Sequence, residues 1–176
     1  ATFMRVLKDF ALFEPSKSGK KDGRLVFPRF HQLRAVERVV GDIAVNGTGG
    51  RYLIWHSAGS GKTKTIAWLC HRLIRHMTED SKSTFDSVIV VTDRNVLDEN
   101  IRHDMNLVQS SKGLVVSVGE QSGAKSPQLK RALVEGDHII TCTLQTFPEV
   151  MKLIEDTNEL RGRRWAVVAD EAHSSQ

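Results

Sequence analysis

One short stretch of this chain restricts its fold more than any other part of the sequence. It reads RYLIWHSAGSGKTKTIAW and covers residues 51–68. An apolar run from Tyr52 to Trp55, bounded by turn residues, predicts a short buried strand over residues 51–55. From Lys62 onward the apolar residues recur at helical spacing, which predicts a helix over residues 62–77. The chain is therefore expected to pass from strand to helix through a loop of small residues.

The loop between this strand and this helix has the composition of an anion-binding site. Its glycines tolerate positive φ, and its backbone N–H groups can surround a phosphate at the positive end of the following helix. The pattern departs from the phosphate-loop template GxxxxGK[ST] only at His56, where the template has its first glycine. A Gly/Ser-rich turn without a ligand is the alternative, which the strand–loop–helix context disfavours. The residues predicted to hold ATP phosphates are Gly59, Ser60, Gly61, Lys62 and Thr63, with Lys62 at the β- and γ-phosphates and Thr63 on Mg²⁺.

The rest of the chain alternates between apolar strand patterns and helical patterns. Such alternation favours one mostly parallel sheet with helices on both faces, a three-layer α/β sandwich. Before it, residues 2–13 are expected to form an amphipathic helix and residues 14–24 a polar loop. Strands are expected over residues 51–55, 85–92, 113–118, 138–144 and 165–170, and helices over residues 31–45, 62–77, 94–109 after an Asp93 cap, 127–135 and from Pro148.

A pair of adjacent carboxylates ends the last of these predicted strands. The segment WAVVADEAH, residues 165–173, places Asp170 and Glu171 at the carboxyl end of a strand, where ligands gather in parallel sheets. A hydrolytic nucleotide site needs one carboxylate near Mg²⁺ and one to orient or deprotonate water. Asp170 suits the first role and Glu171 the second. His173 either couples this site to another surface or only begins a helix.

The length and composition of the chain indicate how many domains it forms, whether it can span a membrane, and what its cysteines and charges do. The chain has 176 residues, enough for one domain with a real core, and no apolar run approaches the roughly 20 residues that span a membrane. Its two cysteines, Cys70 and Cys142, lie in apolar segments and are expected to be buried free thiols. The net charge is +4, and the basic excess lies in residues 1–34. Contact with nucleic acid would explain that excess, but a lysine-rich surface loop is the favoured explanation.

Several motifs together resemble one protein family. AGSGKT followed by DEAH resembles the first RecA-like domain of superfamily 2 helicases. The segments RFHQLRAV, IWHSAGSGKT, VVTDRNVLDEN, TLQTFP and VVADEAHSSQ, in this order, resemble the motor subunit of type I restriction enzymes. His56 is usual in the loop of that subunit. The resemblance covers nearly the whole chain, including FMRVLKDFALFE, which resembles the join between the nuclease domain and the motor.

The resemblance implies a RecA-like fold and an ATP-driven motor on double-stranded DNA in the prokaryotic cytoplasm. It implies partners, namely the specificity and methyltransferase subunits of a restriction-modification complex, and no membrane. Gln32 would contact adenine, as in the Q motif of these helicases. Backbone contacts with DNA suit a motor that ignores base sequence. The residues that match motifs touching the DNA backbone are Thr92, Arg94, Asn95, Thr143 and Thr146.

The resemblance also implies what lies outside this chain. Residues 1–24 would join an upstream nuclease domain, and residues 25–176 would be the first motor domain, ending just after DEAH. The second RecA-like domain, with its arginine finger, would be absent, so the isolated chain is expected to hydrolyse ATP poorly. Alternatives are a type III restriction motor, a DEAH-type RNA helicase, or a nucleotide-binding switch without turnover. Glu171 argues against the switch, because a switch needs no group to activate water.

Overall fold

A parallel sheet of four strands forms the centre of the molecule. The computed structural model describes residues 2–15, 23–57, 59–93, 104, 115–118, 127–136 and 138–170. The strand order is β4-β5-β3-β6, and the register aligns Val90 of β3 with Thr141 on one side and Val168 on the other. The sheet consists of β3 (Ser87–Thr92), β4 (Val115–Val118), β5 (His138–Thr143) and β6 (Trp165–Ala169).

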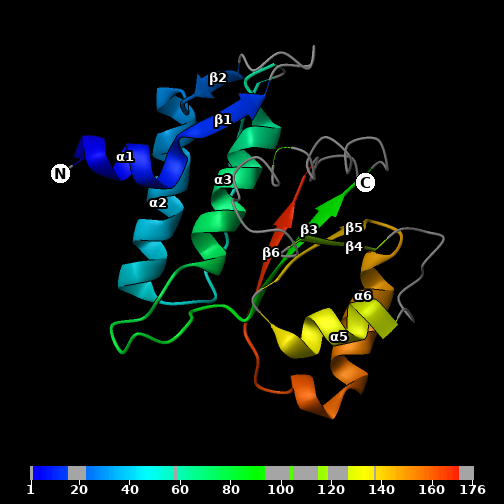
Figure 1. Ribbon diagram of the computed structural model, residues 1–176. Coiled ribbons are helices and arrows are strands. Elements are labelled where there is room, and N and C mark those ends of the chain that lie inside the picture. The colour runs from blue at the N-terminus through cyan, green and yellow to red at the C-terminus, as the bar shows by residue number, and fades with distance from the viewer. Residues whose placement is uncertain are drawn as a thin grey trace.

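Helices cover both faces of this sheet, as Figure 1 shows. Successive residues of a strand point to opposite faces. Val88 and Val90 of β3 accordingly join a core with α2 and α3, whereas Ile89 and Val91 join a second core with α5 and α6. The predicted three-layer α/β sandwich is therefore confirmed. The flanking helices are α2 (Phe30–Asn46), α3 (Lys62–Ile74), α5 (Pro127–Glu135) and α6 (Phe147–Asp156), followed by the short 3₁₀ helix η1 (Asn158–Leu160).

The N-terminal region differs from its prediction. Helix α1 (Thr2–Phe10) ends three residues earlier than expected, and β1 (Leu12–Pro15) follows it. This strand pairs antiparallel with β2 (Gly23–Val26), so the expected polar loop over residues 14–24 is wrong at both of its ends. Leu12, two residues after the end of the helix, lies in the same buried core as Phe10. These two side chains are only 3% and 1% exposed, respectively.

The predicted strand over residues 51–55 is wrong. Residues 51–57 have no regular secondary structure, and Leu53 and Trp55 are 82% and 90% exposed. A strand needs a neighbour that takes up its N–H and C=O groups. Within the described residues, the outer edge of β6 has no partner strand, and a cavity separates that edge from residues 51–56. The apolar run therefore lies along the cavity without joining the sheet.

The other element boundaries agree with the predictions to within a few residues. Helix α3 ends at Ile74, short of residue 77, and α6 begins at Phe147, which places Pro148 in its first turn. Of the helix expected after Asp93, only Asp104 is described, and it is helical. Both cysteines are buried and form no disulfide within the described residues, in agreement with the prediction of thiols. Among the described helices, none has the length and apolar character needed to cross a membrane.

Candidate functional site

The glycine-rich loop enters helix α3 through two left-handed residues. Gly59 has φ +73° and Gly61, the residue before the helix, has φ +84°. A side chain in this region costs about 1–2 kcal/mol, which explains why glycine stands at both positions. The loop also turns tightly, since Ser60 N donates a hydrogen bond to Ser57 O at 3.2 Å. Lys62 and Thr63 follow as the first two residues of α3 and are partly buried.

Helix α2 holds this loop from the side. Gln32 Nε2 donates to Gly61 O at 3.0 Å, and Gln32 Oε1 accepts a hydrogen bond from Arg29 N at 2.8 Å. The side chain is 4% exposed, and a β-carbon on Gly61 would lie 2.6 Å from its Nε2 atom. Gln32 therefore lies beside the loop, and both ends of its amide bind backbone. Its contact with adenine stays a prediction.

Two histidines also lie beside the loop. His31 Nε2 lies 3.1 Å from Ser60 O, and its ring meets the ring of His56 edge-on at a centroid distance of 5.3 Å. Burial lowers the pKa of His56 below its usual value, and His31 and Lys62 add to this effect. His56 is accordingly neutral at neutral pH, so Lys62 supplies the positive charge next to it. The deviation from the phosphate-loop template thus places a neutral ring here.

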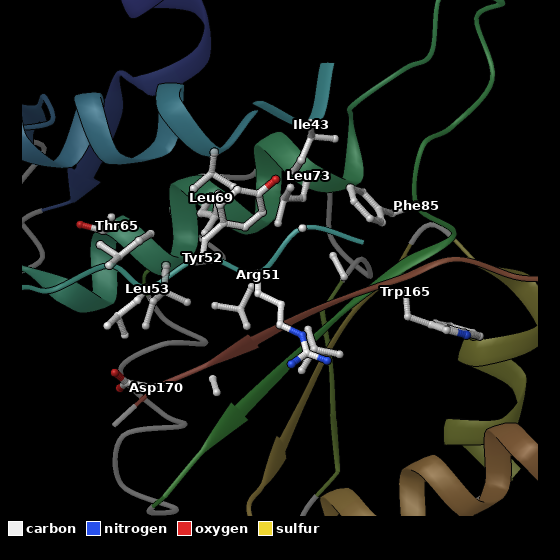
Figure 2. A pocket seen from close by; sticks show the side chains of 18 of the residues that line it. Ile43, Arg51, Tyr52, Leu53, Thr65, Leu69, Leu73, Phe85, Trp165 and Asp170 are labelled. Atoms are coloured by element: carbon white, nitrogen blue, oxygen red, sulfur yellow. The ribbon is translucent and has the colours of Figure 1, made fainter. Parts of the chain in front are cut away.

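A cavity of about 1030 Å³ joins the loop to the end of β6. It lies between residues 48–56, one face of α3, and β6, and its lining is largely apolar. Figure 2 shows Asp170 in this lining, together with Leu53 and Thr65. Lys62 lines the same cavity, so the structure brings together the predicted phosphate-binding lysine and the predicted metal-binding carboxylate. Asp170 N donates to Val91 O at 2.9 Å, which fixes the backbone at this point.

The groups at this end of the cavity fit a magnesium nucleotide. A lysine ammonium group, a loop with two left-handed glycines and a helix N-terminus are suited to phosphate oxygens. Mg²⁺ prefers oxygen ligands, and the hydroxyl of Thr63 and the carboxylate of Asp170 are of that kind. The second predicted carboxylate, Glu171, and the neighbouring His173 lie outside the described residues.

The threonines predicted to contact DNA have buried side chains. Thr92, Thr143 and Thr146 are 1%, 3% and 7% exposed. The hydroxyls of Thr143 and Thr146 lie 3.1 Å apart, and Thr146 Oγ1 also donates to Thr143 O at 3.1 Å. These bonds close the turn between β5 and α6, which gives both residues a structural role. The predicted Arg94 and Asn95 lie outside the described residues, and DNA contact at all five positions stays a prediction.

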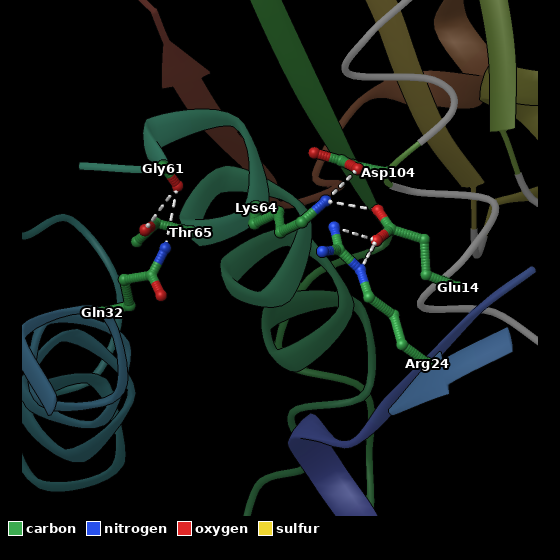
Figure 3. Close-up of polar contacts among 7 residues, drawn as sticks. All are labelled: Glu14, Arg24, Gln32, Gly61, Lys64, Thr65 and Asp104. Atoms are coloured by element: carbon green, nitrogen blue, oxygen red, sulfur yellow. Dashed lines mark hydrogen bonds and ion pairs between the residues drawn. The ribbon is translucent and has the colours of Figure 1, made fainter. Parts of the chain in front are cut away.

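Sequence reasoning did not identify a group of ionic residues beside the loop. Lys64 Nζ lies 2.7 Å from Asp104 Oδ1 and 3.3 Å from Glu14 Oε1, and Arg24 also binds Glu14 (Figure 3). These carboxylates are 40 and 50 residues from Lys64 in the sequence. No local pattern links charges so far apart. The lysine could have been noted only for its place directly after the GKT triplet.

The fold and the site define a nucleotide-binding α/β sandwich of the phosphate-loop type. A comparison with known families agrees with this class of protein and identifies one family within it. Residues 31–176 match the SWI2/SNF2 ATPase family, so this chain belongs to that family. The resemblance to a helicase-type motor, based on the motifs, is thereby confirmed.

One curated relative is named as a subunit of a restriction enzyme. It comes from Methanocaldococcus jannaschii and is named "Putative type I restriction enzyme MjaVIIIP endonuclease subunit". The two sequences are 22% identical over 189 residues, which cover 97% of this chain. The same alignment covers 18% of the relative, so this chain spans about a fifth of that protein's length.

Proposed function

We propose that this chain is the ATP-binding part of a motor that moves along double-stranded DNA in a type I restriction enzyme. The observation that carries the proposal is that Lys62, directly after the glycine-rich loop, and Asp170 line one cavity. Membership in the SWI2/SNF2 ATPase family and the name of the archaeal relative support it. The enzyme as a whole would hydrolyse ATP and use the free energy for translocation.

The residues of the site divide the work of hydrolysis. Lys62 would neutralise charge on the β- and γ-phosphates, and the loop amides would orient them. Thr63 and Asp170 would hold Mg²⁺, which would offset the negative charge of the phosphates. Glu171 would orient the attacking water and accept its proton.

The proposed partners follow from the same family resemblance. Double-stranded DNA would contact the motor through its phosphate backbone, since a translocase must pass over any sequence. The specificity and methyltransferase subunits of a restriction-modification complex would choose the DNA site, in the cytoplasm of a prokaryote. The basic excess in residues 1–34 would add sequence-independent attraction to DNA.

ATP hydrolysis by the full-length protein, with and without double-stranded DNA, tests this function. Lys62→Ala should abolish the binding of Mg·ATP measured by calorimetry. Glu171→Gln should keep that binding and lower the hydrolysis rate by about 10²-fold or more. Lys152→Ala, which removes an exposed lysine on α6, is the matched control and should change neither.

Three results would contradict the proposal. Mg·ATP binding that survives in Lys62→Ala would remove the loop as the phosphate site. Hydrolysis that responds to RNA and not to double-stranded DNA would indicate a helicase of another kind. Equal hydrolysis by Glu171→Gln and the unmodified protein would mean that this carboxylate does not activate water.

A further inference from the structure

Residues 2–15, which we call the N-terminal arm, contact one face of helix α3 through Asp9, Phe10 and Glu14. Three side chains of α3, at positions 64, 68 and 72, bind the arm. A spacing of four residues places them on one face of the helix, one above another. The contacts are Lys64 Nζ with Glu14 Oε1 at 3.3 Å, Trp68 Nε1 donating to Phe10 O at 3.1 Å, and Arg72 Nη1 donating to Asp9 Oδ2 at 2.5 Å.

The middle of this contact is buried. Phe10 and Trp68 are each 1% exposed, and their ring centroids lie 6.3 Å apart. The guanidinium carbon of Arg72 lies 6.0 Å from the centre of the Phe10 ring, so a cation–π contact adds to its ion pair. The arm is thus part of the same apolar core as α2, α3 and the sheet. The arm therefore packs along most of the length of α3.

Lys64 connects the arm with a third segment of the chain. Figure 3 shows its ammonium group between Glu14 of the arm and Asp104, which comes from the region between β3 and β4. Burial acts to lower the pKa of Lys64, but the hydrogen bonds and charges of the two carboxylates outweigh this and raise it. The lysine is therefore charged, and it lies two residues after Lys62 in the same first turn of α3.

We propose that the N-terminal arm positions α3, and that Lys64, Trp68 and Arg72 are positioning residues for the phosphate-binding loop. The helix is continuous from Lys62 to Ile74, so a shift of its arm-facing side moves Lys62 and Thr63 with it. This inference rests on the proposed function, because it assigns a purpose to the position of the proposed phosphate-binding lysine.

The first experiment weakens the contact at its far end, away from the loop. Asp9→Asn and Arg72→Met each remove one charge of the ion pair. In the full-length protein, each should weaken Mg·ATP binding about threefold or more, measured by calorimetry. Arg75→Met is the matched control, since Arg75 is exposed at the end of α3, and it should leave the affinity unchanged. The swapped pair Asp9→Arg with Arg72→Asp should restore part of the affinity.

A second measurement works without nucleotide and separates positioning from general stability. Thr65 N donates to Gly61 O at 3.1 Å, so its amide hydrogen exchange reports on the start of α3. Asp9→Asn and Arg72→Met should accelerate exchange at Thr65 more than at Ile89, in the centre of the sheet. Two results would overturn the inference when the affinity for Mg·ATP is also unchanged. One is equal acceleration of exchange at both amides, and the other is no acceleration at Thr65. If the unmodified protein does not bind Mg·ATP, the proposed function fails, and exchange at Thr65 alone decides whether the arm positions the helix.

Discussion

Residues 51–57 and strand β6 are two apolar runs that both lead to residues of the site, yet only β6 is a strand. β6 pairs in parallel with β3 along its length. Residues 51–57 lie on the other side of the cavity, and their largest side chain, Trp55, is 90% exposed. The difference teaches that apolar character favours a strand only where a neighbouring edge is within hydrogen-bonding reach.

The largest loss of stability is expected when a side chain in the centre of the sheet is shortened. Ile89 of β3 is fully buried in the core shared with α5 and α6. Ile89→Ala should lower the free energy of unfolding by about 2–5 kcal/mol, because it removes buried methyl groups and leaves a cavity. Urea denaturation followed by circular dichroism measures this. A loss below about 1 kcal/mol would mean that packing on this face of the sheet contributes little to the stability of the protein.

A smaller effect is expected in the loop that follows residues 51–57. Gly61→Ala should destabilise the protein by about 1–2 kcal/mol through its positive φ, and further through the contact with Gln32 Nε2 at 2.6 Å. Gly59→Ala is the matched control, since Gly59 has a similar φ but an added Cβ there would meet no atom within 4 Å. Thermal unfolding of both variants compares them. Equal losses would show that the Gln32 contact adds nothing.

Acid should destabilise the protein through His56, which lies beside the glycine-rich loop. Burial lowers the pKa of His56 from its ordinary value of 6.5, so the folded state takes up a proton less readily than the unfolded state. His56 therefore contributes its full stabilisation at pH values above its ordinary pKa. This contribution is lost as the pH falls from the ordinary pKa toward the lower pKa of the folded state. The drop in Tm between about pH 7.5 and pH 5.5 should therefore be smaller in His56→Asn than in the unmodified protein. An identical drop in both proteins would refute this.

The smallest effect is expected within residues 51–57 themselves. Leu53→Ala should change the free energy of unfolding by less than about 0.5 kcal/mol, because the side chain is 82% exposed. Trp55→Ala should behave in the same way, in contrast to Ile89→Ala. Losses above about 2 kcal/mol in these variants would mean that the segment packs as a strand in solution, and the comparison with β6 would no longer hold.

Much of the fold followed from local patterns. The Ser126-Pro127 start signal predicted α5, and continuous apolar runs predicted β5 and β6, all nearly to their ends. The same reasoning placed Lys62 and Asp170 at one end of the sheet, and they line a common cavity. It failed over residues 12–15, where β1 and its partner β2 are only four residues long, too short for a clear period.

What the sequence by itself determined is the chemistry of the loop: two glycines, a lysine and a threonine between an apolar run and a helix. The tertiary structure alone decided that Gln32 binds the loop backbone, that Lys64 joins Glu14 to Asp104, and that residues 51–57 stay outside the sheet. The physical reason is the range of the interactions. Local spacing records which side of an element is buried, whereas hydrogen bonds and ion pairs between distant segments depend on which surfaces meet after folding.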